Sequence, residues 1–289
     1  MGFWRARDIV KQYGGDFFQG MLTMPSDIQK AVVVLYQFVR VPDQMIDDES
    51  IKTDEQKQQA KQLIQDYYMG RKKAYEDRDE GHKIFGPVVR IFYSYGIDFG
   101  YSESFFQSML QDTQKCRYET YDELKSYIYG SAEVIGLMMI QIMGYNFDIS
   151  DPEYEHKYTK VIHCAAKLGE AFQLSNFLRD VHEDLLLGRV YIPQDMLAKY
   201  NITHEQLRNY HLTQQVDEAF AWCMTELVDR VDAMHDEANI WITLLNPACQ
   251  KAIQLSSDLH RWILQRIRDS KYNVFDKKFQ KNSFGRLVD

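Results

Sequence analysis

Two segments of the chain carry the same arrangement of acidic residues. In each, two aspartates stand four residues apart: Asp43 and Asp47 in one, Asp180 and Asp184 in the other. If the segments are helical, each pair projects from one helical face, one turn apart. Two such pairs facing each other would repel and take up protons unless cations lay between them. Hard divalent ions bind carboxylate oxygens and leave positions for water and phosphate, so the spacing predicts a metal site for a phosphorylated ligand.

An acidic pair on one helix is more often a solvated surface than a site. Here the neighbouring residues favour a site, because apolar side chains interleave with both pairs in QFVRVPDQMIDD and SNFLRDVHED. Arg40 precedes the first pair by about one turn, and Asn176 and Arg179 precede the second. Charges embedded in apolar helices are poorly explained by solvent exposure alone.

The spacing of apolar residues predicts an all-α fold. Apolar side chains recur every three or four residues through most of the 289 residues, which include only six prolines and fifteen glycines. No linker-like stretch divides the chain, so residues 1–289 are expected to form one domain. No Gly-x-Gly-x-x-Gly motif is present, which disfavours a dinucleotide fold. The expected helices are 28–40, opened by a capping box of Ser26 and Gln29 and kinked or restarted at Pro42, then 53–76, 83–95, 102–116, 121–144, 153–187, 214–245 and 248–271.

Composition excludes several classes of protein. The formal net charge of −8, with no basic stripe to offset it, argues against nucleic acid as a partner. Four scattered cysteines without Cys-x-x-Cys spacing argue against a zinc site or a disulfide framework and favour a reducing compartment. No segment resembles a signal peptide or a membrane-spanning helix. We therefore expect a cytoplasmic protein, soluble or peripheral to the membrane.

Three segments, in order along the chain, resemble the squalene/phytoene synthase family of head-to-head prenyl synthases, and bacterial phytoene synthases most. Residues 165–195 are similar to the second aspartate-rich signature of that family, residues 36–49 to the first, and residues 127–139 to the helix between them. The resemblance implies an isoprenoid synthase fold, in which a helical bundle surrounds a central cavity capped by the two aspartate clusters.

The resemblance also implies roles for individual residues by their position in these motifs. The metal ligands, for Mg²⁺ or alternatively Mn²⁺, are expected to be Asp43, Asp47, Asp180 and Asp184. The residues expected to bind or orient diphosphate are Arg40, Asn176, Arg179 and Lys277. Those expected near the reacting carbons, together with Arg40, are Tyr36, Tyr127, Tyr129, Gln173 and Tyr191.

The implied activity is the head-to-head condensation of two prenyl diphosphates. The leading expectation is phytoene from two geranylgeranyl diphosphates through a cyclopropyl diphosphate, without NADPH. The alternative is a C30 synthase that makes dehydrosqualene, squalene or hydroxysqualene from farnesyl diphosphate. Because the substrates carry long apolar tails, peripheral contact with a membrane is a reasonable hypothesis. The oligomeric state is left open.

Two departures from the family pattern bear on these expectations. Where many members carry a serine-containing segment that closes the diphosphate site, this chain has YGGDFF at residues 13–18, so that Asp16 adds negative charge. At a position where tyrosine is common, the chain has His260, which is read as a packing residue. The first departure keeps open a third alternative, a catalytically silent relative that serves as an assembly protein.

A di-iron carboxylate bundle is a further all-α alternative. Such a bundle needs paired Glu-x-x-His motifs, and only Glu153 with His156 fits that spacing. We therefore set this reading aside.

Overall fold

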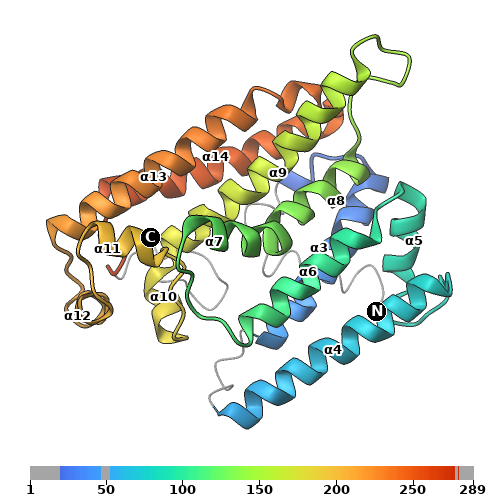
Figure 1. Ribbon diagram of the computed structural model, residues 1–289. Helices are drawn as coiled ribbons and strands as arrows, with labels where there is room; N and C mark the ends of the chain where they lie inside the picture. Colours follow the sequence, from blue (N-terminus) through green and yellow to red (C-terminus); the bar gives the residue numbers. More distant parts are fainter. Residues whose placement is uncertain (1–19, 47–52, 277–278, 280–289) are drawn as a thin grey trace.

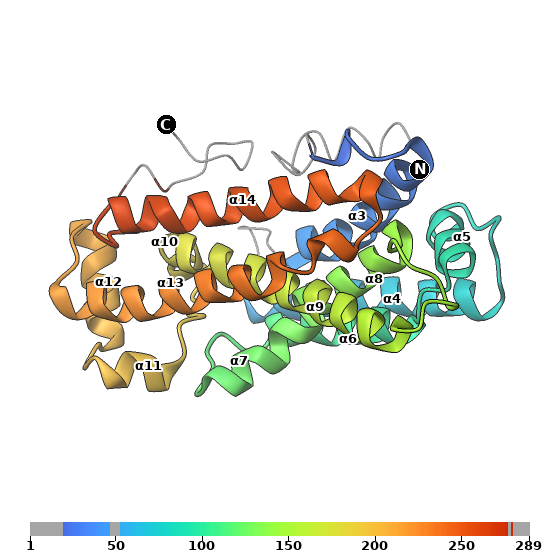
Figure 2. The same ribbon diagram turned by 90° about the horizontal axis from the view of Figure 1, so that it is seen from above.

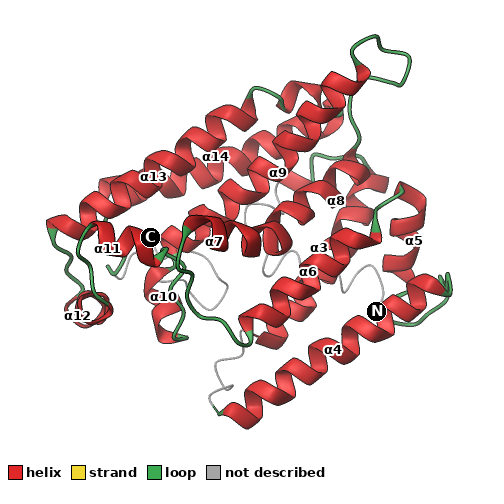
Figure 3. Ribbon diagram, in the orientation of Figure 1, coloured by secondary structure: helices red, strands yellow, loops and turns green. Residues whose placement is uncertain are grey.

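The computed structural model describes residues 20–46, 53–276 and 279, and for Asp43, Ile46, Asp54 and Lys57 it describes the backbone alone. In this part of the chain all regular structure is helical apart from two isolated bridges, Arg117 with Val190 and Tyr145 with Leu245 (Figure 3). The helices are α3 Ser26–Ile46, α4 Asp54–Glu76, α5 Gly86–Tyr95, α6 Phe99–Asp112, α7 Tyr121–Ile128, α8 Val134–Met143, α9 Tyr154–Arg179, α10 Val181–Leu186, α11 Gln194–Lys199, α12 His204–Thr213, α13 Glu218–Asn239 and α14 Pro247–Asp269. A π-helical segment, Tyr129–Glu133, joins α7 to α8, and a 3₁₀ turn, Ile242–Leu244, lies between α13 and α14.

Helix α9 is the central element of the bundle. It contacts α8, α13, α14 and the π-helical segment, and Figures 1 and 2 show α13 and α14 running beside it. Helices α3, α4, α5 and α6 gather on the other side of α8. Two large apolar clusters fill the interior, one around α3, α6 and α8 and the other around the C-terminal half of α9, α13 and the end of α14.

Small residues let the segment before and within α8 lie close against α9. A Cβ atom added to Gly136 would stand 2.2 Å from the carbonyl oxygen of Ala165, and one added to Gly169 would stand 2.7 Å from that of Ala132. Both distances are shorter than van der Waals contact, so the two backbones approach this closely only because glycine is present.

Several expected element boundaries are wrong. The helix expected over 121–144 is interrupted by the π-helical segment, and the one expected over 102–116 ends at Asp112. The helix expected over 153–187 is broken at Asp180 into α9 and α10. The helix expected to reach residue 245 ends at Asn239. Helix α3 continues through Pro42 to Ile46 instead of restarting there.

The capping box expected at the start of α3 is also absent. Ser26 is the first helical residue, and the Gln29 amide instead donates to the carbonyl oxygen of Met24 at 2.8 Å. A capping box does open α4, where Thr53 and Gln56 exchange hydrogen bonds between side chain and backbone.

A buried arginine holds α3 against α4 and α6. Arg71 is 1% exposed, donates to the Ser102 hydroxyl, and places its guanidinium 4.4 Å from the ring centres of both Phe38 and Phe106. Burial lowers the pKa of Arg71 to about 9. Because the faces of aromatic rings attract a cation, these contacts compensate part of the cost of burying the charge. Phe38 lies two residues after Tyr36, so Arg71 supports the part of α3 that faces the site.

Candidate active site

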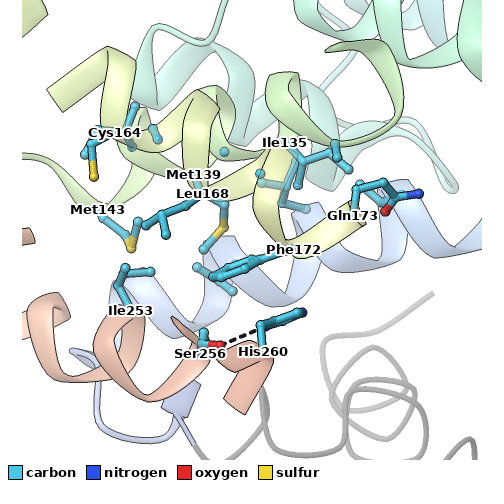
Figure 4. A pocket seen from close by; sticks show the side chains of 18 of the residues that line it. Ile135, Met139, Met143, Cys164, Leu168, Phe172, Gln173, Ile253, Ser256 and His260 are labelled. Atoms are coloured by element: carbon cyan, nitrogen blue, oxygen red, sulfur yellow. Dashed lines mark hydrogen bonds between the residues drawn. The ribbon is translucent and has the colours of Figure 1, made fainter. Parts of the chain in front are cut away.

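A cavity of about 370 Å³ lies between α3, α8, α9 and α14. Its walls are almost entirely apolar, as the close view in Figure 4 shows with Ile135 and Met139 from α8, Leu168 and Phe172 from α9, and Ile253 from α14. Helix α3 contributes the fourth wall through Val32, Leu35, Tyr36 and Val39. The central cavity expected from the sequence is therefore present, and its size and apolar lining are typical of a ligand pocket.

The cavity is polar at one end only. In Figure 4, Met143 and Cys164 lie at one end, whereas Gln173 and His260 lie toward the other. Asn176 follows Gln173 by nearly one turn of α9, so both amides face the same cavity. The polar groups thus point toward the end where α9 meets the second aspartate pair.

Asp180 lies where α9 ends, and Arg179 binds it directly. The arginine Nε donates to Oδ1 at 2.5 Å and Nη2 donates to Oδ2 at 2.7 Å, with both side chains about 85% buried. Burial acts to lower the pKa of Arg179, but the charge of Asp180, its hydrogen bonds, and the charges of Glu183 and Asp184 outweigh it and raise the pKa. The guanidinium therefore remains a cation among three carboxylates.

The break in the helix preserves the spacing of the second aspartate pair. The backbone N–H of Asp184 donates to the carbonyl oxygen of Asp180 at 2.9 Å, which keeps the two residues one turn apart. The chain then turns at Gly188, whose φ of 74° lies in the left-handed region, and the Arg189 N–H returns to the carbonyl oxygen of Asp184 at 2.8 Å. This closed turn fixes the backbone on which both carboxylates stand.

The first aspartate pair falls partly outside the described residues. Asp43 belongs to α3, about two turns after Tyr36 and one turn after Arg40, but its side chain is not described. Asp47, Lys277 and the segment 13–18 lie outside the described residues altogether. In the part of the chain that is described, no three His, Cys, Asp or Glu side chains converge as a metal site. That the two aspartate pairs together form one metal site therefore remains a prediction.

Two of the expected tyrosines lie beside the cavity rather than in its lining. Tyr127 and Tyr191 donate to the two oxygens of the Asp112 carboxylate, at 2.6 Å and 3.3 Å. The Tyr191 ring also stacks on Phe177 with ring centres 3.9 Å apart. Burial first, and then the charge of Asp112, raises the pKa of both phenols, so they stay protonated donors. Asp112, at the end of α6, has no motif around it that marks it as their partner.

Tyr129, the third of these tyrosines, is partly exposed to solvent. It opens the π-helical segment, its side chain is 42% exposed, and among the described residues it is absent from the cavity lining. Its neighbours Ser131 and Ala132 line the cavity instead. The Ser131 hydroxyl is buried there without a hydrogen-bond partner among the described residues, which makes it a polar contact for a ligand that the sequence did not suggest.

Comparison with known proteins places the chain among prenyl synthases. The family model described as squalene/phytoene synthase matches residues 10–284. The chloroplastic phytoene synthase of an Oncidium hybrid cultivar is 31% identical over 278 residues, which cover 95% of this chain and 63% of that protein. Phytoene synthase 1 of Arabidopsis thaliana is 29% identical over 276 residues, covering 95% and 61%. The chain thus spans less than two thirds of the length of these relatives.

Solved structures share the fold. A dehydrosqualene synthase in complex with a ligand matches with a TM-score of 0.77 at 21% identity, covering 98% of this chain and 91% of that one. Squalene synthase HpnC from Alicyclobacillus acidocaldarius matches with a TM-score of 0.75 at 20% identity, covering 93% and 94%. The expected all-α bundle is confirmed. Among the described residues, no helix combines the length and the apolar character that crossing a bilayer requires.

Proposed function

The chain belongs to the squalene/phytoene synthase family, and from this premise we propose that it joins two prenyl diphosphates head to head. The proposed substrates are two molecules of geranylgeranyl diphosphate and the proposed product is phytoene, formed through a cyclopropyl diphosphate. The two relatives compared above are phytoene synthases, which supports the C40 product. The observation that carries the proposal is the meeting of an apolar cavity with the charged end of α9.

The charged end of α9 fits a hard divalent ion. The charges of Asp180, Glu183 and Asp184 all act on the guanidinium of Arg179, so three carboxylates gather at this end. All of the donors are carboxylate oxygens, which Mg²⁺ prefers. The proposed ligands are Asp180 and Asp184, together with Asp43 and Asp47 of the first pair. When bound, Mg²⁺ would stabilise the negative charge of a departing diphosphate.

Different side chains around this end are proposed to bind different parts of the substrate. Arg179, kept protonated by its acidic neighbours, and Arg40 are proposed to hold diphosphate oxygens, with the Asn176 amide as a neutral donor. Tyr36 and Gln173 line the adjoining cavity and would contact the carbons next to the departing group. The prenyl tail would lie along the apolar walls between Phe172 and Met143.

The cavity walls protect the cation that ionisation leaves behind. Apolar side chains exclude water, which would otherwise capture the cation as an alcohol. The Phe172 ring lines the cavity, and aromatic rings can stabilise a nearby cation through their π electrons. The second prenyl diphosphate would then attack through its C1–C2 double-bond region, and no group on the described surface of the cavity competes as a charged nucleophile.

The test is to incubate the protein with Mg²⁺ and equal amounts of farnesyl and geranylgeranyl diphosphates, with and without NADPH, and to identify products by mass spectrometry. We expect a C40 hydrocarbon that forms without NADPH. A C30 product would move the assignment to farnesyl diphosphate, and a product that requires NADPH would indicate a reductive squalene-type reaction. No turnover and no Mg²⁺-dependent binding of either substrate would contradict the proposal and favour a non-catalytic relative.

Because the proposed substrates and product are strongly apolar, peripheral contact with a membrane surface is part of the proposal. Flotation of the protein with vesicles that contain geranylgeranyl diphosphate tests it. Recovery with the vesicles would support this contact, and full recovery in the soluble fraction would contradict it.

A further inference from the structure

His260 lines the cavity from α14 and stacks on a ring of α9. Its ring centre lies 4.0 Å from that of Phe172, with the two planes 12° apart. In Figure 4 the imidazole extends beside Phe172 toward the end of the cavity that Gln173 occupies. The stacking fixes the plane of the imidazole, so its two nitrogens have defined positions.

The hydrogen bond that His260 makes identifies its tautomer. Its Nδ1 lies 2.7 Å from the carbonyl oxygen of Ser256, one turn earlier on the same helix. A carbonyl oxygen can only accept, so Nδ1 carries the hydrogen. In the neutral ring Nε2 then holds a lone pair, and among the described residues Nε2 makes no hydrogen bond.

The surroundings keep this ring neutral. Burial lowers the pKa of His260 to about 3; the hydrogen bond to Ser256 opposes this shift, and His235 of α13 and Arg179 of α9 add to it. Among the described residues, the other titratable groups that line this cavity are Tyr36 of α3 and Cys164 of α9, whose thiol pKa burial raises. A neutral imidazole does not repel a carbocation, and its lone pair is available at every pH at which the protein would work.

We propose that Nε2 of His260 accepts the proton whose loss ends the condensation, which makes His260 a catalytic residue. This inference rests on the proposed function and deepens it, because it assigns the final step to a named atom. His235 is a buried histidine without access to the cavity. Its ring is fully buried and donates from Nδ1 to the Ser257 hydroxyl at 2.9 Å. Among the described residues, it is not part of the cavity lining.

The step balances without an oxidant or a reductant. The C–H bond on the carbon next to the cationic carbon breaks, its electron pair forms the new C=C double bond, and the proton forms an N–H bond at Nε2. The imidazolium then passes the proton to the released diphosphate or to water, which restores the neutral ring. A weak base is sufficient because a C–H bond beside a cationic carbon is strongly acidic, and correct placement matters more than basicity.

The test compares His260→Phe with His260→Gln. Phenylalanine keeps a ring against Phe172 but has no lone pair, whereas glutamine keeps an acceptor oxygen. For each protein, the olefin formed per diphosphate released is measured together with alcohols and the cyclopropyl intermediate. We expect His260→Phe to form about 100-fold less olefin per diphosphate released, with alcohol or intermediate in its place, and His260→Gln to recover part of the loss.

The matched control is His163→Phe, the same replacement at an exposed histidine on α9 that pairs with Glu237 outside the cavity. It should leave the ratio of olefin to diphosphate unchanged, and thermal melts establish that each variant is folded. An unchanged ratio in His260→Phe would overturn the inference while leaving the proposed function intact. A wild-type product formed by water capture or by hydride transfer would also overturn it, and a wild-type protein that releases no diphosphate would overturn both.

Discussion

The middle and the C-terminal end of helix α9 place opposite environments in one site. From Cys164 to Phe172 the helix lines an apolar cavity, and from Asn176 to Asp180 it leads into a segment where a buried arginine lies among three carboxylates. An apolar cavity alone would bind a prenyl tail but could not stabilise a leaving diphosphate. A charged segment alone could hold diphosphate but would leave a carbocation exposed to water. One continuous helix meets both requirements because it holds the apolar cavity and the charged segment at a fixed distance from each other.

The largest expected effect is at the charged end. Asp184→Asn keeps the shape of the side chain but removes a proposed metal ligand, so we expect turnover to fall by about 10² to 10³-fold while the melting temperature changes little. The measurement is diphosphate release at saturating Mg²⁺. The control Asp66→Asn, on the exposed face of α4, should retain wild-type turnover. Equal turnover in both variants would remove Asp184 from the metal site.

Two buried histidines, in and near the cavity, should make the stability of the protein depend on pH. His235 and His260 have folded pKa values lowered to about 4 and about 3 by burial, against an ordinary 6.5. The unfolded chain therefore takes up protons that the folded protein does not, and stability falls as the pH drops below 6.5. Between pH 7.5 and pH 5 each histidine should cost about 2 kcal/mol of unfolding free energy.

Denaturant unfolding at the two pH values measures this loss. His260→Phe removes one of the two titrating groups, so its loss should be smaller by about 2 kcal/mol. An identical pH dependence in the wild type and the variant would mean that His260 is not held neutral by its surroundings.

The close approach of α8 and α9 can be disturbed without changing any charge. Gly136→Ala introduces a Cβ atom 2.2 Å from the carbonyl oxygen of Ala165, so the helices must separate, at a cost of about 1 to 3 kcal/mol. Gly81→Ala is the matched control, since its nearest neighbour would be a side-chain oxygen of Asp79 at 3.5 Å. Chemical denaturation of both variants measures the difference. Equal stabilities would show that the helix contact accommodates the extra carbon.

The smallest effect is expected for an ion pair outside the site. Arg90 and Glu80 approach to 3.3 Å, but their side chains are 62% and 52% exposed. Glu80→Gln should therefore change stability by less than about 0.5 kcal/mol and leave turnover unchanged. This variant shows what the loss of an exposed ion pair does, for comparison with changes near the buried pair of Arg179 and Asp180. A loss as large as that in Asp184→Asn would mean that charge in general, and not the site, controls activity.

The spacing of apolar residues determined which helices could be predicted from the sequence. The repeat of apolar residues identified the long helices, because spacing within one helix determines which residues share a face. The short helices α11 and α12 were missed, since six- and ten-residue polar segments lack a sustained repeat. The break at Asp180 was missed because the residues on both sides continue a helical pattern.

The residues expected at the site came mainly from the resemblance to the family motifs. Gln173 and Asn176, whose roles that resemblance implied, stand three residues apart on one face of α9 and line the cavity. The partnership of Tyr127 and Tyr191 with Asp112 joins three separate elements, and spacing within a helix carries no information about which neighbour covers it. Tyr129 opens a π-helical segment, and the sequence pattern gave no sign of that interruption of the helix.

The most direct test of head-to-head joining uses geranylgeranyl diphosphate labelled with ¹³C at C1. The isolated product is analysed by NMR for one-bond coupling between the two labelled carbons. The account predicts that the labelled carbons are bonded directly to each other in a C40 hydrocarbon. A product in which the labelled carbons are separated, or release of diphosphate with only single-chain alcohols, would contradict it.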